Sequence, residues 1–327
     1  MFIETSETKQ NLTRKVPTEE LYGLPVDTSV LFSDHKGIYK RRVEIQQRKL
    51  LVKLSQIAPF LGRSEKILFI FTGCSPTSAV EQMLTGTFLQ PLKRSLFVFT
   101  DRRILHIPTA TNRSYRNSIA QIMFTDCRQL RIRGSTLIAK YKSGRTEKFR
   151  CIGSKGKKKV RLLLKNTSLE GRATLLLERT PLCPRCTNTL IKNYYECPNC
   201  SLKFKKKLWA TLLSIILPGG GYFYTRHPFL GLLDAFMEIL FASLLTLLST
   251  AFFLLTSPDD QWRLGHAIIV CSTILVLEKL STIMFSCKSV EEFIPKQRYV
   301  DVMIDQTPTR RSRPEPEDAL SIGWRSR

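Results

Sequence analysis

Two apolar stretches decide the architecture of this chain, FLGLLDAFMEILFASLLTLLSTAFFLLT at residues 229–256 and LGHAIIVCSTILVLEKLSTIMFS at residues 264–286. The hydrocarbon core of a bilayer is about 30 Å thick, and an α-helix crosses it in roughly 20 residues. Both stretches reach that length, so the sequence predicts two membrane-spanning helices. The alternative is a buried helical hairpin in a large soluble core, where helices are usually shorter.

A third apolar stretch, LWATLLSIILPGGGYFY at residues 208–224, is interrupted by Pro218 and three glycines. Proline removes a backbone donor and consecutive glycines weaken a helix. We expect this stretch to enter the bilayer and turn back, or to lie in the interface, and the sequence leaves open whether it crosses. Residues 208–286 together form the predicted membrane anchor.

Charge is distributed unevenly around the anchor. The link at residues 257–263 reads SPDDQWR, with two acids and the interfacial residue Trp262. Basic residues instead flank the outer ends of the anchor, namely Lys203, Lys205, Lys206, Lys207, Lys288, Lys296 and Arg298. Because Lys and Arg next to a span prefer the cytoplasmic side, we expect two crossings with both termini in the cytoplasm.

Three acidic residues, Asp234, Glu238 and Glu278, lie inside the apolar stretches. An ionisable group in a spanning helix costs on the order of 3 kcal/mol on insertion scales and faces a partner or a cavity. They could mark an ion or proton path. The alternative places Asp234 and Glu238 near the headgroups, and pairs Glu278 with Lys279 or with another subunit.

Residues 213–224 and 228–233, LSIILPGGGYFY and PFLGLL, resemble small bacterial membrane modules in which a Pro-Gly turn and an aromatic-Tyr pair join two helices. The resemblance implies integration into a bacterial inner membrane and little about activity.

The whole chain is strongly basic, with 51 Lys and Arg against 27 Asp and Glu and a formal net charge of +24. Such an excess attracts phosphate, either of nucleic acid or of anionic lipid. Since a membrane protein always has a leaflet beside it, anionic lipid is the expected partner. A protein partner and nucleic acid are alternatives, and the oligomeric state stays open.

The N-terminal part divides at about residue 40. Residues 1–40 are polar and aperiodic, so we expect them to be mostly disordered. Residues 41–64 have the pattern of a basic amphipathic helix, which could lie on a membrane or pack on the next domain. Its apolar side consists of Val43, Gln47, Leu50, Leu54, Ile57 and Leu61.

From residue 65 to 166 the apolar period changes to two, which predicts an antiparallel sheet followed by a closing helix. The expected strands are residues 67–71, 96–99, 103–107, 119–124, 130–132, 137–141 and 146–151. Hairpin turns are expected at Arg133-Gly134 and Ser143-Gly144.

The segments EKIL at 65–68, LFVFTDRRILHI at 96–107 and IAQI at 119–122 resemble bacterial domains of the pleckstrin-homology-like (PH-like) and GRAM type. The resemblance implies a barrel of strands closed by a C-terminal helix, and binding of lipid headgroups or peptides rather than catalysis. An insertion at residues 75–95, expected to be partly helical, departs from the simplest pattern.

Basic side chains on the expected strands and closing helix are the candidate ligands for phosphate, since alternate strand residues share a face. They are Arg102, Arg103, Arg131, Arg133, Lys140, Lys142, Lys157, Lys158 and Lys159. The alternative is a solvated outer face beside the membrane.

Two CxxC pairs, CPRC at 183–186 and CPNC at 197–200, carry the sharpest chemical signal. Four thiolates in this spacing bind one tetrahedral Zn²⁺, and a ribbon too short for a core folds around such a metal. We therefore predict that Cys183, Cys186, Cys197 and Cys200 form a structural zinc ribbon at residues 175–204. Thiol redox chemistry and nucleic-acid binding are the alternatives.

The sequence contains no recognisable catalytic motif, and residues 287–327 are predicted to be a juxtamembrane segment followed by a disordered tail. The expected molecule is a multi-domain α+β membrane protein with a PH-like barrel, a zinc ribbon and a helical hairpin. We expect a membrane-tethered binding or scaffold protein rather than an enzyme. A nucleic-acid-binding regulator and a subunit of a transport complex are the alternatives.

Overall fold

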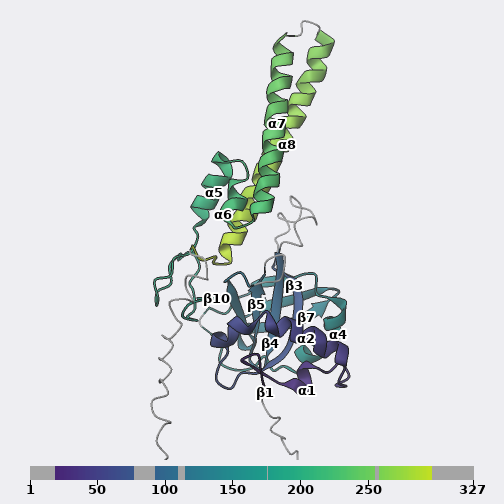
Figure 1. The fold of residues 1–327 in the computed structure, drawn as a ribbon, viewed down its shortest axis with the longest axis vertical. Helices are drawn as coiled ribbons and strands as arrows, with labels where there is room; N and C mark the ends of the chain where they lie inside the picture. The colour runs from purple at the N-terminus through teal and green to yellow at the C-terminus, as the bar shows by residue number, and fades with distance from the viewer. Residues whose placement is uncertain (1–18, 77–92, 110–114, 175, 255–257, 297–327) are drawn as a thin grey trace, which may run out of the picture.

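A computed structural model of the chain describes residues 19–76, 93–109, 115–174, 176–254 and 258–296. The protein is a mixed α+β molecule: a body of two sheets with short helices lies at the base of a long helical hairpin (Figure 1). Within the predicted insertion, residues 77–92 lie outside the described part, as do residues 1–18 and the tail from 297.

The body contains a seven-stranded sheet in the order β1-β2-β3-β4-β5-β6-β10 and a three-stranded sheet in the order β7-β8-β9. Neighbouring strands are antiparallel except β2 and β3. The strands of the larger sheet are β1 (Glu19–Leu21), β2 (Leu24–Val26), β3 (Ile67–Cys74), β4 (Arg94–Thr100), β5 (Arg103–Pro108), β6 (Ile119–Met123) and β10 (Thr180–Leu182). Those of the smaller sheet are β7 (Cys127–Arg133), β8 (Thr136–Tyr141) and β9 (Thr146–Phe149). Each strand predicted between residues 65 and 166 is confirmed.

The larger sheet is buried on both faces, and β4 shows why. Leu96 and Val98 belong to a core with the N-terminal helices, whereas Phe97 and Phe99 face the smaller sheet. Successive strand residues point to opposite faces. A run that is apolar at every position therefore fits a strand that is covered on both sides.

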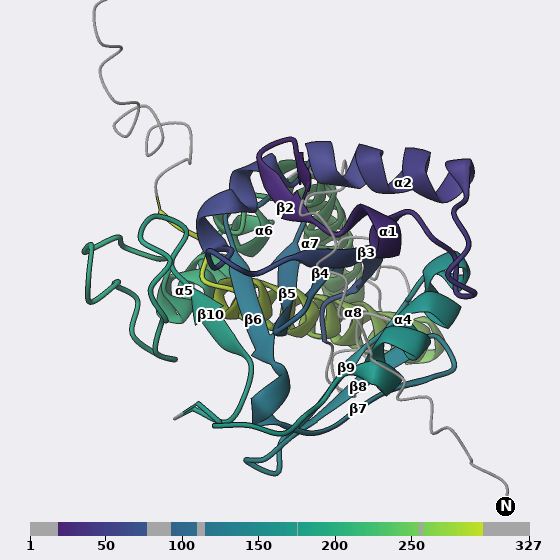
Figure 2. The same ribbon diagram turned by 90° about the horizontal axis from the view of Figure 1, so that it is seen from below.

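Two helices cover the sheets, α2 (Arg41–Val52) on the larger one and α4 (Ser154–Asn166) beside the smaller one (Figure 2). The buried amide of Gln47 donates to the carbonyl of Ile70 at 2.9 Å and accepts from the Ile70 N–H at 3.1 Å. The amphipathic stretch at 41–64 therefore packs on the next domain. It forms α2 followed by the 3₁₀ helix η1 (Ser55–Phe60).

Residues 19–40 differ from the prediction of a mostly disordered segment. They form β1, β2 and α1 (Thr28–Leu31), and Leu24, Val26 and Leu31 are fully buried in the core. Tyr22 and Gly23 join β1 to β2 with both φ angles positive, as in the two-residue turns that match strand twist. Elements of three and four residues are too short to give a periodic signal.

The hairpin consists of α7 (Pro228–Leu254) and α8 (Pro258–Glu291), two helices long and apolar enough to cross a membrane. Few of their residues are buried within the protein. In the apolar 18-residue segment of each helix, 6% of the residues are buried in α7 and 17% in α8. Two shorter helices, α5 (Lys207–Ile216) and α6 (Gly220–Tyr224), lie beside the half of the hairpin nearest the body (Figure 1). They enter and leave at the same end, so the chain turns back on itself between α5 and α6.

The start and the end of the helical part are joined to each other. The N–H of Lys205 donates to the carbonyl of Ile294 at 3.0 Å, and Phe204 forms an isolated antiparallel bridge with Pro295. The rings of Phe204 and Phe293 pack edge to face with centroids 5.5 Å apart. This contact fixes where the helices leave the body.

Candidate functional site

The four predicted metal ligands come together in space. Sγ of Cys183 lies 3.5 Å from Sγ of Cys200, Sγ of Cys186 lies 3.5 Å from Sγ of Cys197, and all four sulfurs lie within 4.8 Å of one another. A tetrahedron of sulfurs with metal bonds of about 2.3 Å has edges of about 3.8 Å. The cluster is therefore compatible with a four-coordinate metal ion.

Each CxxC pair is held by the same backbone arrangement. The N–H of Cys183 donates to the carbonyl of Asn188 at 2.8 Å, and the N–H of Cys197 donates to that of Leu202 at 2.9 Å, five residues ahead in both cases. The residue after each second cysteine, Thr187 or Ser201, has a positive φ. Two equivalent turns thus present four sulfurs to one point, with no open position for a substrate.

The cysteine segment is attached to both other parts of the protein. Upstream, β10 pairs with β6 of the large sheet. Downstream, Leu202 and Phe204 share a small core with Leu190 and with Phe293 beyond α8. A metal at the cluster would therefore stabilise the contact between body and helices, and its role would be structural.

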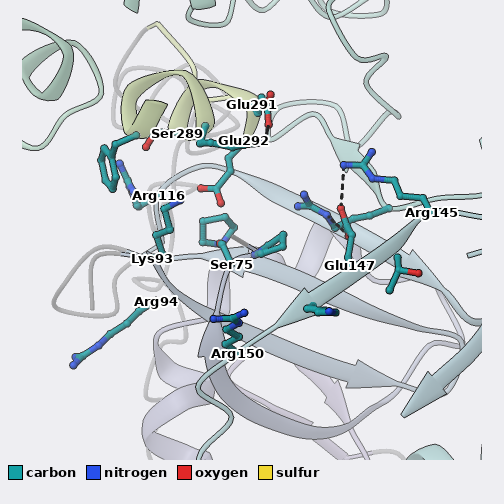
Figure 3. A pocket seen from close by; sticks show the side chains of 17 residues that line it. Ser75, Lys93, Arg94, Arg116, Arg145, Glu147, Arg150, Ser289, Glu291 and Glu292 are labelled. Carbon is teal, nitrogen blue, oxygen red and sulfur yellow. Dashed lines mark hydrogen bonds and ion pairs between the residues drawn. The ribbon is translucent and has the colours of Figure 1, made fainter. Parts of the chain in front are cut away.

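A cavity of about 380 Å³ lies between the body and the last turns of α8. Figure 3 shows Lys93 and Arg116 with Glu292 beneath α8, and Arg145 and Glu147 on the side of β8 and β9. Eight basic residues line this cavity: Lys93, Arg94, Arg116, Arg145, Lys148, Arg150, Arg179 and Lys288. Its three acidic residues are Glu147, Glu291 and Glu292. The lining therefore carries a formal excess of five positive charges, which suits an anionic ligand.

Some of these charges are paired within the wall. Arg179 bonds to Glu147 at 3.0 Å, and Arg145 bonds to Glu178 outside the cavity at 2.8 Å. Arg116 donates to the carbonyl of Thr225 at 3.0 Å, which ties the body to the loop before α7. Arg94 and Lys148 are exposed residues of the cavity lining, on β4 and β9.

Lys93 is a partly buried lysine of the cavity wall. Its ammonium lies 5.6 Å from the ring centroid of Phe285 on α8. Burial lowers the pKa of Lys93 to about 8, because the charged form loses hydration, and the carboxylate of Glu292 opposes this shift. The cavity therefore holds a cation that gains from a bound negative charge.

A buried polar network lies behind the cavity and centres on His106. Nε2 of His106 lies 3.1 Å from the hydroxyls of both Ser75 and Ser95, and Nδ1 lies 3.2 Å from a guanidinium nitrogen of Arg179. Burial lowers the pKa of His106 well below its usual value. Arg179 can only donate, so Nδ1 accepts and Nε2 carries the hydrogen. His106 therefore cannot take a proton from either serine through Nε2, and the pair is not a nucleophile with its base.

Two of the predicted phosphate ligands are engaged inside the body. Arg103 bonds to the buried carboxylate of Glu65, with Nη2 2.6 Å from Oε2. Lys159 is buried and donates to the hydroxyl of Ser33 at 2.7 Å and to the carbonyl of Asp34 at 3.1 Å. Both side chains stabilise the fold, so neither fits the predicted role in an exposed binding surface.

The remaining predicted ligands do not line the cavity. Arg102 follows β4 at the end opposite Arg94, about 20 Å away at about 3.3 Å per strand residue. Arg131 and Arg133 are exposed on β7, Lys140 and Lys142 are exposed on and just after β8, and Lys157 and Lys158 lie on α4. The basic residues that line the cavity are thus different from the phosphate ligands predicted from strand alternation.

The three acidic residues of the helices also meet, with an oxygen of each of Asp234, Glu238 and Glu278 within 4.8 Å of the others. Lys279 pairs with Glu238 at 2.6 Å, which corrects the predicted pairing of Lys279 with its neighbour Glu278. Adjacent residues on an α-helix point about 100° apart, and Lys279 points toward α7 and α5.

Comparisons with protein-family models, with curated proteins and with solved structures found no significant match.

Proposed function

We propose that this chain is a membrane-tethered binding protein whose basic body binds anionic phospholipid headgroups. The observation that carries this proposal is the cavity between the body and the end of α8, with its eight basic residues. Phosphate groups are bound by such cations through charge-assisted hydrogen bonds. The ligand set is therefore the cavity lining rather than the strand faces.

Depth along α8 supports a lipid as the ligand. Trp262 at the start of the helix is exposed, and tryptophan prefers the membrane interface. Phe285 follows it by 23 positions, about 35 Å along the helix axis at about 1.5 Å per residue. With Trp262 at one interface, Phe285 and the cavity lie at the headgroups of the other leaflet, since the hydrocarbon core is about 30 Å thick.

The arrangement of strands supports a PH-like body. Strands β3 to β6 form an antiparallel meander, β7 to β9 form a second one, and α4 follows directly. Within the proposal the body is a binding domain, the four cysteines hold a structural Zn²⁺, and the protein resides in a bacterial inner membrane. The basic flanks of the helices favour a cytoplasmic side for the body and both termini.

The cavity position distinguishes this proposal from the nucleic-acid alternative. A nucleic acid needs a basic surface that is open along its length, whereas these cations surround a cavity against α8. A lipid whose headgroup enters this cavity can leave its acyl chains beside α8 in the bilayer. Phe285 supplies the apolar part of the wall on that side.

The test is lipid binding by the full chain in a neutral detergent, measured as fluorescence anisotropy of a tail-labelled phosphatidylglycerol. The double variant Arg94→Gln, Lys148→Gln removes two exposed charges of the cavity lining. Each cation near an anionic surface contributes about 1 kcal/mol, so affinity is expected to fall roughly 30-fold.

The matched control is Arg102→Gln, Arg131→Gln, which removes the same charge from surfaces away from the cavity. We expect it to leave affinity within a factor of about two, because distant surface charges are screened by salt. Equal losses in both double variants would mean that only net charge matters and would refute the cavity as the site. Displacement by duplex DNA but not by unlabelled phosphatidylglycerol would favour the nucleic-acid alternative instead.

A further inference from the structure

Three carboxyl groups and one ammonium group meet between the helices, away from the cavity. Asp234 and Glu238 lie on α7, and Glu278 and Lys279 lie on α8. Glu278 precedes Phe285 by seven positions, about 10 Å along α8. With Phe285 at the headgroups, the group lies inside the hydrocarbon region of the leaflet nearest the body.

Donors reach some of these oxygens and not others. Lys279 Nζ donates to Oε2 of Glu238 at 2.6 Å and to the carbonyl of Ser214 on α5 at 2.9 Å. Thr282 Oγ1 lies 3.2 Å and 3.3 Å from the two carboxyl oxygens of Asp234. The re-entrant helix α5 thus closes the group on one side.

Three carboxyl oxygens lack any hydrogen-bond donor within the described part of the chain. They are Oε1 of Glu238, whose side chain is only 6% exposed, and both oxygens of Glu278, which are themselves shielded from solvent. A buried charged oxygen without a donor is strongly unfavourable in an apolar environment. The three acidic groups therefore not only lie close together but also lack donors for three of their oxygens. This lack of donors indicates that a positively charged ligand binds there.

An oxygen of Glu278 lies within 4.8 Å of an oxygen of Asp234. Two ionised carboxylates cannot hydrogen-bond to each other, because neither carries a hydrogen. A single proton supplies it and removes one of two uncompensated negative charges. Carboxyl pairs in contact hold one proton between them for this reason.

We propose that Asp234 and Glu278 share one proton, so that α7 and α8 form a proton-binding site within the membrane. The proton comes from water, binds one carboxyl oxygen and breaks no bond in the protein. The other groups that face the pair are Glu238 on α7, Lys279 on α8 and the phenol of Tyr222 on α6. The Glu238–Lys279 ion pair stays intact.

A proton fits this site better than a metal ion. The ammonium of Lys279 already lies among the carboxylates, 2.6 Å from Glu238. A metal cation placed there would be repelled by Lys279 at short range in a medium of low dielectric constant. A proton adds no comparable charge, because it neutralises the oxygen to which it binds.

The experiment is infrared spectroscopy of the full chain in lipid nanodiscs, since the carbonyl stretch of a protonated carboxyl group is separate from the bands of a carboxylate. At pH 7 we expect one protonated carboxyl group in the parent chain and its loss in Glu278→Gln. The matched control is Glu291→Gln, on the same helix but outside the apolar stretch, which should retain the band. Should Glu278→Gln fail to insert, Asp234→Asn is expected to remove the same band.

Three results would overturn the proposal. One is a parent chain without a protonated carboxyl band at pH 7. Another is the same band in Glu278→Gln at unchanged helix content. The third is binding of one divalent metal ion per chain that is lost in Glu278→Gln. This site goes beyond the proposed lipid binding, and the outcome here leaves the anisotropy test of the cavity unaffected.

Discussion

We expect Lys93 to make the proposed lipid binding depend on pH in a defined window. Its pKa is lowered to about 8, so raising the pH from 7 to 9 takes the protonated fraction from about 90% to about 10%. If only the charged form binds the headgroup, the apparent Kd scales inversely with that fraction. Affinity should therefore fall up to about tenfold, or about 1.4 kcal/mol, as pH rises through 8.

The measurement is the anisotropy titration with phosphatidylglycerol, whose phosphodiester charge stays constant over this range. The variant Lys93→Arg keeps its charge at both pH values, so its binding should be independent of pH. Lys148→Arg, at an exposed position of the cavity lining, should retain the pH dependence of the parent chain. Equal affinity of the parent chain at pH 7 and 9, or an unchanged slope in Lys93→Arg, would show that Lys93 does not contact the ligand.

Three further changes test the structure itself. Replacing Cys197 by Ser should lower zinc from about one ion per chain to less than half, measured by elemental analysis in reducing buffer. Gly219 has a φ of +67°, and an added Cβ would overlap a carbonyl oxygen near the start of α7. Gly219→Ala should therefore lower the melting temperature in detergent far more than Gly134→Ala, whose φ is also positive but which has open space around it. Arg103→Met leaves the carboxylate of Glu65 buried without its partner, and should cost about 3–5 kcal/mol of unfolding free energy at pH 7 in denaturant titrations. A loss below about 1 kcal/mol would contradict that role.

Periodicity predicted the strands between residues 65 and 166, and apolar length predicted the helices of the hairpin. It missed residues 19–40, where elements of three and four residues are held by burial of Leu24, Val26 and Leu31. The cluster of four cysteines was predicted from their spacing. Each CxxC pair lies within four residues of sequence, so only the contact between the two pairs had to be inferred.

The cavity could not be predicted in the same way. Its cations come from the start of β4, from Arg116, from β9 and the residues beside it, from Arg179 before β10 and from α8, which are far apart in sequence. The alternation of side chains along a strand also does not distinguish an exposed arginine from one that is paired inside the protein. Arg103, for example, bonds to the carboxylate of Glu65, 38 positions earlier in the sequence. A lysine inside a mostly basic helix, such as Lys159, gives no sign that it points inward.

The hydrogen bond between Lys205 and Ile294 makes the helical part a closed insertion. The chain leaves the body and returns to it at neighbouring backbone atoms, so helices that cross a membrane here would have to cross it an even number of times. It also means that the helices could be excised and the ends rejoined by a few residues, because domain insertions with adjacent ends leave the host fold unbroken. Phe204 and the cysteine cluster would remain on the host side of that junction.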